Sequence, residues 1–270
     1  MRVHIISDME GVGGICRPEQ VVAGKPMYEE GRKLYTEEIN AAVRGAFDAG
    51  ATEVVVMDHH GAGEGYSFNS LVPDQLDPRC EYVVQDAWTE YTGFLEEGCD
   101  ACLLVGMHAR AGTPDGVMNH TVSGQSWQDL WFNGTLVGET GINAALCGSF
   151  GTPVALVTGD AAACREATEL LGDGVTTVSV KQGIGASAAR MIPPVRVREL
   201  IEAGAKAALA DLSKVGPYDP GRPCEIRVLF KTTTDPAKLE QMPGVELVDP
   251  RTVVSRADDW WAAWRQFFFS

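Results

Sequence analysis

Five short apolar runs, rich in β-branched residues, constrain the fold of this chain more than any other feature. They cover residues 3–7, 53–58, 101–107, 153–158 and 175–180, and segments with helical periodicity separate several of them. Continuous apolar runs of this kind are typical of strands that are buried on both faces. Their alternation with helices predicts an α/β fold with a parallel-rich sheet flanked by helices.

Helix and hairpin signals lie between these runs. A long helix is expected over residues 27–49, where apolar residues recur near helical spacing and Gly50 provides a C-terminal stop. Asn133 and Gly134 form the pair that favours a type I′ turn, so a hairpin is expected around them. Another helix is expected to begin near Thr140, directly after that hairpin.

The pattern changes in the last third of the chain. Pro193 and Pro194 precede a helix expected over residues 195–212, and short strands are expected at 224–231 and 245–248. We therefore predict a larger catalytic α/β domain over residues 1–190 and a smaller C-terminal α/β lobe over residues 191–270, although strands of the lobe could equally extend the first sheet. Near the C-terminus, helical spacing places Trp260, Trp264 and Phe267 or Phe268 on one face, as in a core or a subunit interface.

Composition narrows the class of protein. The 270 residues suffice to bury a substantial core, and a net charge of −15 disfavours nucleic acids and anionic membranes as partners. The sequence shows neither an apolar signal segment nor a run approaching the roughly 20 apolar residues of a membrane span. The seven cysteines form an odd set, typical of reduced structural thiols. These features predict a cytoplasmic protein.

Titratable side chains gather where three of the expected strands end. Asp8 and Glu10 follow the first strand, Asp58, His59 and His60 end or follow the second, and the third is followed directly by a further histidine, His108. Ligand sites in open α/β sheets lie outside the carboxyl ends of the strands, so these groups are expected to converge. Asp8 and Glu10 are two residues apart and can point to one centre while Met9 turns into the core.

The chemistry of this set favours a metal centre. Glu139, at the start of the expected helix, adds a carboxylate, and carboxylate and imidazole groups are ligands of divalent metals. Asp8, Glu10 and Glu139 bring three negative charges, whereas His60 and His108 bind as neutral imidazoles. Two divalent ions with one bridging hydroxide would bring the site to zero charge, so we predict a two-metal site of the zinc type.

Each residue also has a simpler interpretation when taken alone. A strand-end acid is often a helix N-cap or a loop residue, and a single histidine is often a hydrogen-bonded structural residue. Four of the five histidines, however, lie at or just after these strand ends, counting His120 in the glycine-rich loop that follows His108. The joint pattern therefore favours a metal site. The loop that carries His120 could reach over this site, and His120 could then act as acid, base or oxyanion stabiliser.

Glycine-rich segments suggest phosphate binding as a competing hypothesis. The GVGG segment at residues 11–14 lacks the third spaced glycine of a dinucleotide fingerprint. The GIGASA segment at residues 183–188 matches GxGxxA, but two prolines and a long helix follow it in place of a strand with an acidic end. The sequence contains no GxxxxGK[ST] loop and no GxSxG elbow. Metal-dependent chemistry is the better-supported hypothesis.

Several motifs together resemble one known family. The segments SDMEGVGG, DHHG, GMHARAGTPDGVMNHT and NGTLVGETGINAA, spread over residues 5–145, are similar in order and spacing to hallmarks of the zinc-dependent D-aminopeptidases encoded with dipeptide-permease operons. The segments VTGDAAACREA and VSVKQGIGASAARMIPP resemble later parts of the same family.

The resemblance implies a dinuclear zinc site, with ligands at Asp8, Glu10, His60, His108 and Glu139, and a catalytic histidine at His120. It also implies short peptides with an N-terminal D-residue, such as D-Ala, as substrates, and a homo-oligomer that is a decamer of two pentamers. Relatives commonly carry serine at the position of His59, so we expect this extra imidazole to have a structural role beside the ligands.

These observations predict a cytoplasmic dinuclear zinc aminopeptidase that hydrolyses short D-peptides such as D-Ala-D-Ala with a metal-activated water. Two alternatives stay open. The same centre would also suit another metallohydrolase, such as an amidase or phosphoesterase, and the protein could instead be a non-catalytic assembly module stabilised by metal.

Overall fold

The computed structural model describes residues 1–85, 92 and 94–268, without the side chain of Phe268. Its larger sheet has the strand order β3-β2-β1-β4-β7-β8-β9, and all neighbouring strands are parallel except β8 and β9. The strands are β1 (Arg2–Ser7), β2 (Glu53–Asp58), β3 (Glu81–Val83), β4 (Ala101–Met107), β7 (Val154–Asp160), β8 (Thr176–Gly185) and β9 (Ala188–Met191). The predicted parallel-rich α/β fold is therefore confirmed.

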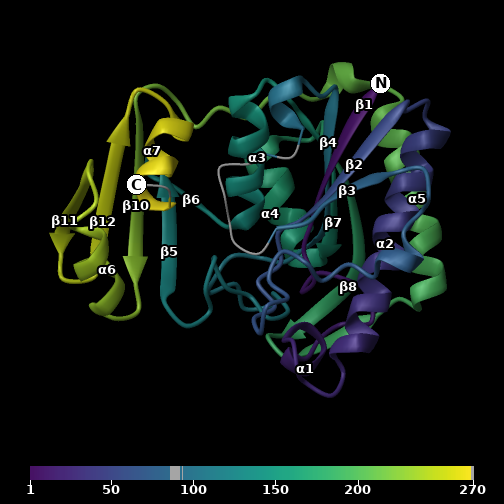
Figure 1. Ribbon diagram of the computed structural model, residues 1–270, viewed down its shortest axis with the longest axis horizontal. Coiled ribbons are helices and arrows are strands. Elements are labelled where there is room, and N and C mark those ends of the chain that lie inside the picture. Colours follow the sequence, from purple (N-terminus) through teal and green to yellow (C-terminus); the bar gives the residue numbers. More distant parts are fainter. Residues whose placement is uncertain (86–91, 93, 269–270) are drawn as a thin grey trace.

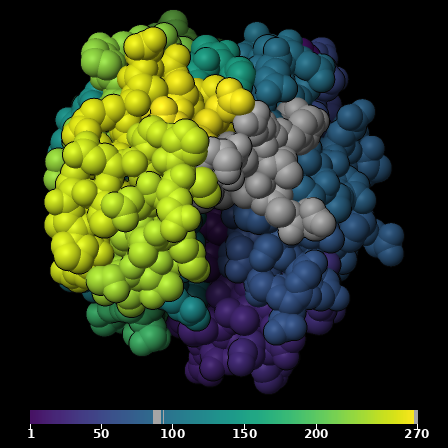
Figure 2. Space-filling model, turned by 60° about the vertical axis from the view of Figure 1, so that its left-hand side comes forward, coloured from purple at the N-terminus to yellow at the C-terminus, as the bar shows by residue number. Residues whose placement is uncertain are grey.

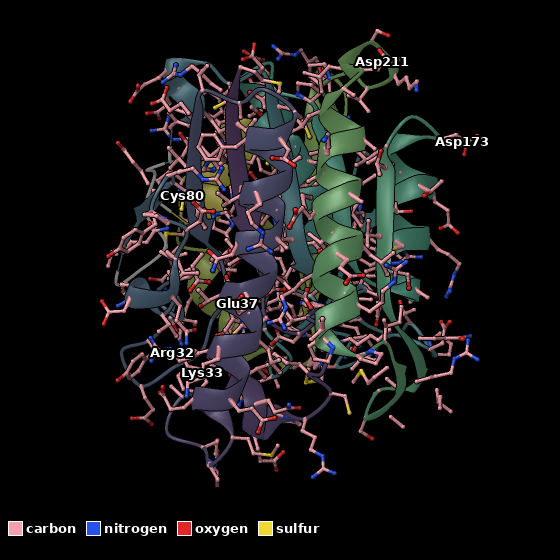
Figure 3. The ribbon with its side chains drawn as sticks, turned by 90° about the vertical axis from the view of Figure 1, so that its right-hand side faces the viewer. Arg32, Lys33, Glu37, Cys80, Asp173 and Asp211 are labelled. Atoms are coloured by element: carbon pink, nitrogen blue, oxygen red, sulfur yellow. The ribbon has the colours of Figure 1, made fainter. Side chains whose placement is uncertain are left out.

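Helices cover both faces of this sheet (Figure 1). Helices α2 (Tyr28–Asp48) and α5 (Pro194–Leu209) lie side by side on one face, as Figure 3 shows, and the ion pair between Arg44 and Glu202 joins them. Helices α3 (Glu139–Ser149) and α4 (Ala161–Leu171) pack on the other face. Burial on both faces explains why these strands read as continuous apolar runs.

A second sheet is antiparallel throughout, with the order β11-β12-β10-β5-β6. Its strands are β5 (Trp127–Phe132), β6 (Thr135–Val137), β10 (Cys224–Phe230), β11 (Val245–Asp249) and β12 (Thr252–Ala257). The predicted hairpin joins β5 and β6, where Asn133 and Gly134 have φ values of 46° and 83°, as a type I′ turn requires.

Helix α7 (Trp260–Phe268) fills the space between the second sheet and α3. Trp260 and Trp264 stack with ring centroids 5.3 Å apart, and both rings meet Phe132 edge-on. Phe267 is also buried. These three aromatic residues of the expected stripe thus form core within the chain. The short helices α1 (Pro18–Val21) and α6 (Thr234–Leu239) and three 3₁₀ turns, at Pro73–Gln75, Leu95–Glu97 and Leu212–Lys214, are also present among the described residues.

Each sheet, taken together with the helices packed on it, includes segments from before and after residue 190, where the boundary was expected. Helix α5 follows that boundary but packs on α2 and the first sheet, whereas β5 and β6 precede it and belong to the second sheet. The division into residues 1–190 and 191–270 stays a prediction. The GIGASA segment forms the end of β8, the tight turn and the start of β9, so its glycines serve a hairpin.

Among the described helices, none combines the length and the apolar character needed to cross a lipid bilayer.

His4 is a fully buried histidine in the middle of β1, and it gives the fold a predictable acid sensitivity. Its ring lies 6.2 Å from that of Phe94, and burial lowers its pKa from 6.5 to about 3. Between these two pH values the unfolded chain binds a proton at His4 and the folded chain does not. The free energy of unfolding is therefore expected to fall by roughly 1.4 kcal/mol for each unit by which the pH is lowered within this window.

We expect His4→Leu to resist acid unfolding better than the wild type, because leucine fills similar space and cannot take up a proton. Acid titration followed by circular dichroism, with both proteins stripped of metal, should place the variant's midpoint at lower pH. Unfolding in urea at pH 8, where His4 is neutral in both states, reports the change in packing alone. Equal acid midpoints would show that another group controls acid unfolding.

Candidate metal centre

The candidate site lies at the carboxyl ends of β1, β2 and β4, where the strand order changes direction around β1. The loop after β1 lies directly against the end of β4: the N–H of Gly11 donates to the carbonyl of Gly106 at 2.8 Å. A Cβ on Gly11 would lie 2.0 Å from the carbonyl oxygen of Met107. The glycine therefore permits a close backbone approach, which brings the side chains after β1 beside those after β4.

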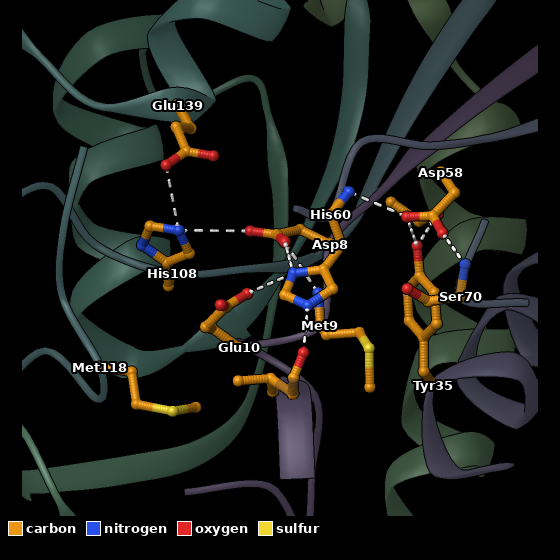
Figure 4. Close-up of polar contacts among 12 residues, drawn as sticks. Asp8, Met9, Glu10, Tyr35, Asp58, His60, Ser70, His108, Met118 and Glu139 are labelled. Atoms are coloured by element: carbon orange, nitrogen blue, oxygen red, sulfur yellow. Dashed lines mark hydrogen bonds and ion pairs between the residues drawn. The ribbon is translucent and has the colours of Figure 1, made fainter. Parts of the chain in front are cut away.

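Asp8 is the central residue of the site, as Figure 4 shows. Its Oδ1 lies 3.2 Å from Nδ1 of His60, and its Oδ2 lies 3.3 Å from Nε2 of His108. Glu10 approaches the first histidine, with Oε2 at 3.0 Å from His60 Nδ1, and Glu139 approaches the second, with Oε1 at 3.3 Å from His108 Nε2. The structure thus brings the five predicted ligands together in two halves that share Asp8.

Backbone carbonyls determine which ring nitrogen of each histidine faces the carboxylates. The Nε2 of His60 lies 2.7 Å from the carbonyl of Val21, and the Nδ1 of His108 lies 3.0 Å from the carbonyl of Ala109. Since a carbonyl only accepts, those nitrogens carry the hydrogen. The opposite nitrogens, His60 Nδ1 and His108 Nε2, are therefore the ones able to bind a metal.

The electrostatics of the site call for positive charge. Burial alone lowers the pKa of His60 and His108, but the surrounding carboxylates raise both pKa values well above the usual range. Burial likewise raises the pKa of Asp8, yet the two imidazoles bring that pKa below its usual value. The same carboxylates would favour a divalent cation beside the ring nitrogens that face them.

The donor atoms fit a metal. Asp8 Oδ2, Glu10 Oε2 and His108 Nε2 are buried and make no hydrogen bond within the part of the chain that the structure describes. Buried polar atoms without hydrogen bonds are costly, so a bound ion gives these atoms a reason to be there. Their mixture of carboxylate oxygen and imidazole nitrogen suits zinc.

His120, which was predicted to be catalytic, lies beside two of the candidate ligands, His108 and Glu139. Its ring stacks on that of His108 with centroids 4.1 Å apart, and its Nε2 lies 3.6 Å from Glu139 Oε1. One donor atom from each of His108, His120 and Glu139 lies within 4.8 Å of the other two, as is also true of Asp8, Glu10 and His108. Geometry alone therefore allows His120 as a ligand as well as a catalytic group.

A small cavity of about 120 Å³ opens onto the site. It is lined by Asp8, Glu10, His59, His60, Gly61, Phe68, His120, Val122 and Glu139. Figure 2 shows the hollow that separates the lobe carrying the second sheet, in yellow-green, from the N-terminal segments in purple and blue. The cavity gives a substrate access to the carboxylates, and Phe68 and Val122 supply apolar contact.

The sequence matches the D-aminopeptidase family, peptidase family M55, over residues 1–269. The chain belongs to the D-aminopeptidase family. This membership confirms the family resemblance and the class of enzyme, a metallo-aminopeptidase, that the motifs predicted.

Two comparisons with individual proteins agree with this assignment. The chain is 34% identical over 256 residues to the D-aminopeptidase of Bacillus subtilis (strain 168), which covers 94% of this chain and 90% of the relative. It superposes with a TM-score of 0.90 on the Zn-dependent D-aminopeptidase DppA from Bacillus subtilis, a self-compartmentalizing protease. That match has 33% identity and covers 98% of this chain and 95% of the other.

The structure also shows residues that support the candidate ligands and that had no role assigned from the sequence. Asp58 accepts the N–H of His60 through Oδ1 at 2.8 Å and the N–H of Ser70 through Oδ2, while Tyr35 donates its hydroxyl hydrogen to Oδ1. Asp58 therefore fixes the backbone that carries His60 and faces away from the centre (Figure 4). Its position at a strand end was the only signal in the sequence.

Two further acids, Glu166 and Asp160, accept backbone N–H groups of the loop after His108. Glu166 in α4 accepts the N–H of Arg110 at 2.9 Å, and Asp160 accepts the N–H groups of Val117 and Ala163 at 2.6 and 2.8 Å. Nothing in the local sequence distinguishes Glu166 from a surface acid of a helix.

His59 and His60 are adjacent but face different groups. His59 places its Nδ1 3.0 Å from Oδ1 of Asn143 in α3, whereas His60 faces Asp8 and Glu10. This arrangement agrees with the structural role expected for His59.

Proposed function

We propose that this chain is a dinuclear zinc aminopeptidase that hydrolyses short peptides with an N-terminal D-residue, such as D-Ala-D-Ala. The main support is the position of Asp8, whose two carboxylate oxygens face two different histidines at 3.2 and 3.3 Å. A carboxylate directed at two imidazoles would suit a pair of neighbouring ions.

The residues divide between the two ions. Glu10 and His60 would hold one, His108 and Glu139 the other, and Asp8 would be shared. When bound, zinc supplies a water that is nucleophilic near neutral pH and polarises the scissile carbonyl. The carbonyls of Val21 and Ala109 keep the two imidazoles in the required tautomer.

We assign proton transfer to His120, whose Nε2 can also donate to the oxyanion once it is protonated. Its Nδ1 donates to the carbonyl of Met118 at 2.9 Å, so the Nε2 that faces Glu139 carries the lone pair. The side chain lines the cavity and remains 22% exposed, which allows it to reach a substrate. From there it can accept a proton from the attacking water and pass it to the leaving amine.

The proposed substrate preference rests on the relatives. Both relatives named above are D-aminopeptidases. Since DppA is a self-compartmentalizing protease, we also propose a homo-oligomer, and by family resemblance a decamer. The cytoplasmic location stays a prediction.

Zinc analysis combined with a stereospecific assay tests this proposal. We expect close to two zinc ions per chain, release of D-Ala from D-Ala-D-Ala, no cleavage of L-Ala-L-Ala, and loss of activity on chelation that added zinc restores. A zinc-loaded enzyme inert towards D- and L-peptides would contradict the proposal. Cleavage of simple amides or phosphoesters instead would favour another metallohydrolase, and a chelator effect on assembly alone would favour a non-catalytic module.

A further inference from the structure

Lys181 is a fully buried lysine in β8 that the proposed chemistry does not use. Its ammonium nitrogen donates three hydrogen bonds, all to backbone carbonyls of the loop that follows β1. The acceptors are the carbonyl oxygens of Glu10, Val12 and Ile15, at 2.5, 2.8 and 2.6 Å. The loop therefore curls around a single positive charge supplied by a strand that lies three places away in the sheet.

Three carbonyl acceptors match the chemistry of an ammonium group. An ammonium has three hydrogens and a neutral amine has two, so the arrangement selects the charged form of Lys181. Burial lowers the pKa of this lysine to about 8, and the nearby carboxylates of Asp160 and Glu38 act in the opposite direction. A buried charge with all its donors satisfied holds the backbone around it firmly.

The opposite side of the same loop is held by α2. The N–H of Gly13 donates to Oε1 of Glu38 at 2.7 Å, and Glu38 is itself buried. The carbonyls at positions 10, 12 and 15 thus face β8, and the N–H at position 13 faces α2. Of the two candidate ligands in this loop, Asp8 and Glu10, only Glu10 has its own carbonyl among the three acceptors.

We propose that Lys181 is a positioning residue for the metal centre: by binding the carbonyls of the loop after β1, it fixes the backbone of Glu10 and so directs that carboxylate toward His60. This inference rests on the proposed function, because it takes Glu10 as a zinc ligand. Replacing a residue that serves the fold alone would lower stability only. Replacing a positioning residue would also weaken zinc binding.

The test measures zinc affinity in Lys181→Met, whose unbranched side chain is one atom shorter and has no donor. We expect zinc to bind at least about tenfold more weakly, as is typical when a group that orients a ligand is lost, with a parallel fall in kcat. Zinc alone is the probe, and competition with a coloured chelator gives its dissociation constant. Wild-type zinc affinity in a folded Lys181→Met protein would overturn the proposal.

A matched control separates positioning from general loss of stability. Val228 is fully buried in β10 of the second sheet, so Val228→Ala should lower the melting temperature and leave the zinc dissociation constant unchanged. If Lys181→Met does not fold, Lys181→Gln, which keeps two N–H donors, takes its place with the same expected loss. An equal loss of zinc affinity in Val228→Ala would overturn the proposal.

Chemical rescue adds a readout that a purely structural role would not move. Lys181→Ala leaves space beside the three carbonyls, and added propylammonium should occupy it and restore part of the zinc affinity. It should leave the affinity of the wild type unchanged. Wild-type zinc affinity in Lys181→Ala, or a loss of affinity that propylammonium does not reduce, would refute the role of the ammonium. Peptidase activity of the wild type separately tests the proposed function, so the two hypotheses can fail independently.

Discussion

Asp8→Asn is expected to lose zinc from both halves of the centre and to have no measurable peptidase activity. Its carboxylate is the one group that faces both His60 and His108, at 3.2 and 3.3 Å. An amide has no negative charge, and its NH₂ group would have to face one of the two positions meant for a cation. Loss of a group beside a ligand typically weakens metal binding 10–100-fold, so loss of a shared ligand should exceed about 100-fold. Zinc content after dialysis measures this directly.

Asp160→Asn is the matched control for that prediction. Asp160 is also a buried acid, at the end of β7, two places from β1 in the sheet, but its partners are the N–H groups of Val117 and Ala163. It should lose stability and keep its zinc. If Asp8→Asn retains zinc as well as Asp160→Asn does, Asp8 is not a ligand and the division of the centre into two halves is wrong.

The strands that carry the site could be predicted because their burial leaves a local signal. β1, β2 and β4 are covered by helices on both faces, so their sequences are apolar throughout, and each run ends at the position where a polar side chain reaches the edge of the sheet. Convergence of Asp8, His60 and His108 follows from parallel pairing alone. Alternation of side chains in an extended segment predicted that Met9, between two acids, turns into the core, and Met9 is fully buried.

The second sheet could not be predicted in the same way. Its β5–β6 hairpin pairs with β10, almost a hundred residues later, and antiparallel pairing over such a distance has no local sequence pattern. The buried supports of the site were missed for a related reason. Glu166 and Lys181 are single polar residues in a helix and a strand, and only the tertiary structure shows that they bind backbone groups of loops bearing His108 and Glu10.

Which of His59 and His60 faces Asp8 also required the structure. Both follow β2 and both are imidazoles, so residue type and spacing do not distinguish them. The N–H of His60 donates to Asp58, and its Nε2 contacts the carbonyl of Val21. These two contacts orient the ring toward Asp8, and the second comes from a segment nearly forty residues away in the chain.

His120→Ala is expected to retain zinc and to lose about 10²- to 10⁴-fold in kcat, the usual contribution of a positioned acid–base group. The result decides between two roles that the geometry allows. His120 stacks on His108 and lies 3.6 Å from Glu139 Oε1, within reach of a ligand as well as a proton-transfer group. A ligand would take zinc with it when removed, whereas a catalytic group would not.

Zinc content and kcat should therefore be measured on the same preparation of His120→Ala, with His59→Ser as the control. His59 lines the same cavity but contacts Asn143, so its replacement should keep zinc and most of the activity. Added imidazole should restore part of the turnover of His120→Ala if the missing function is proton transfer. Loss of zinc in this variant would instead make His120 a ligand, and proton transfer would then have to be reassigned to another group lining the cavity.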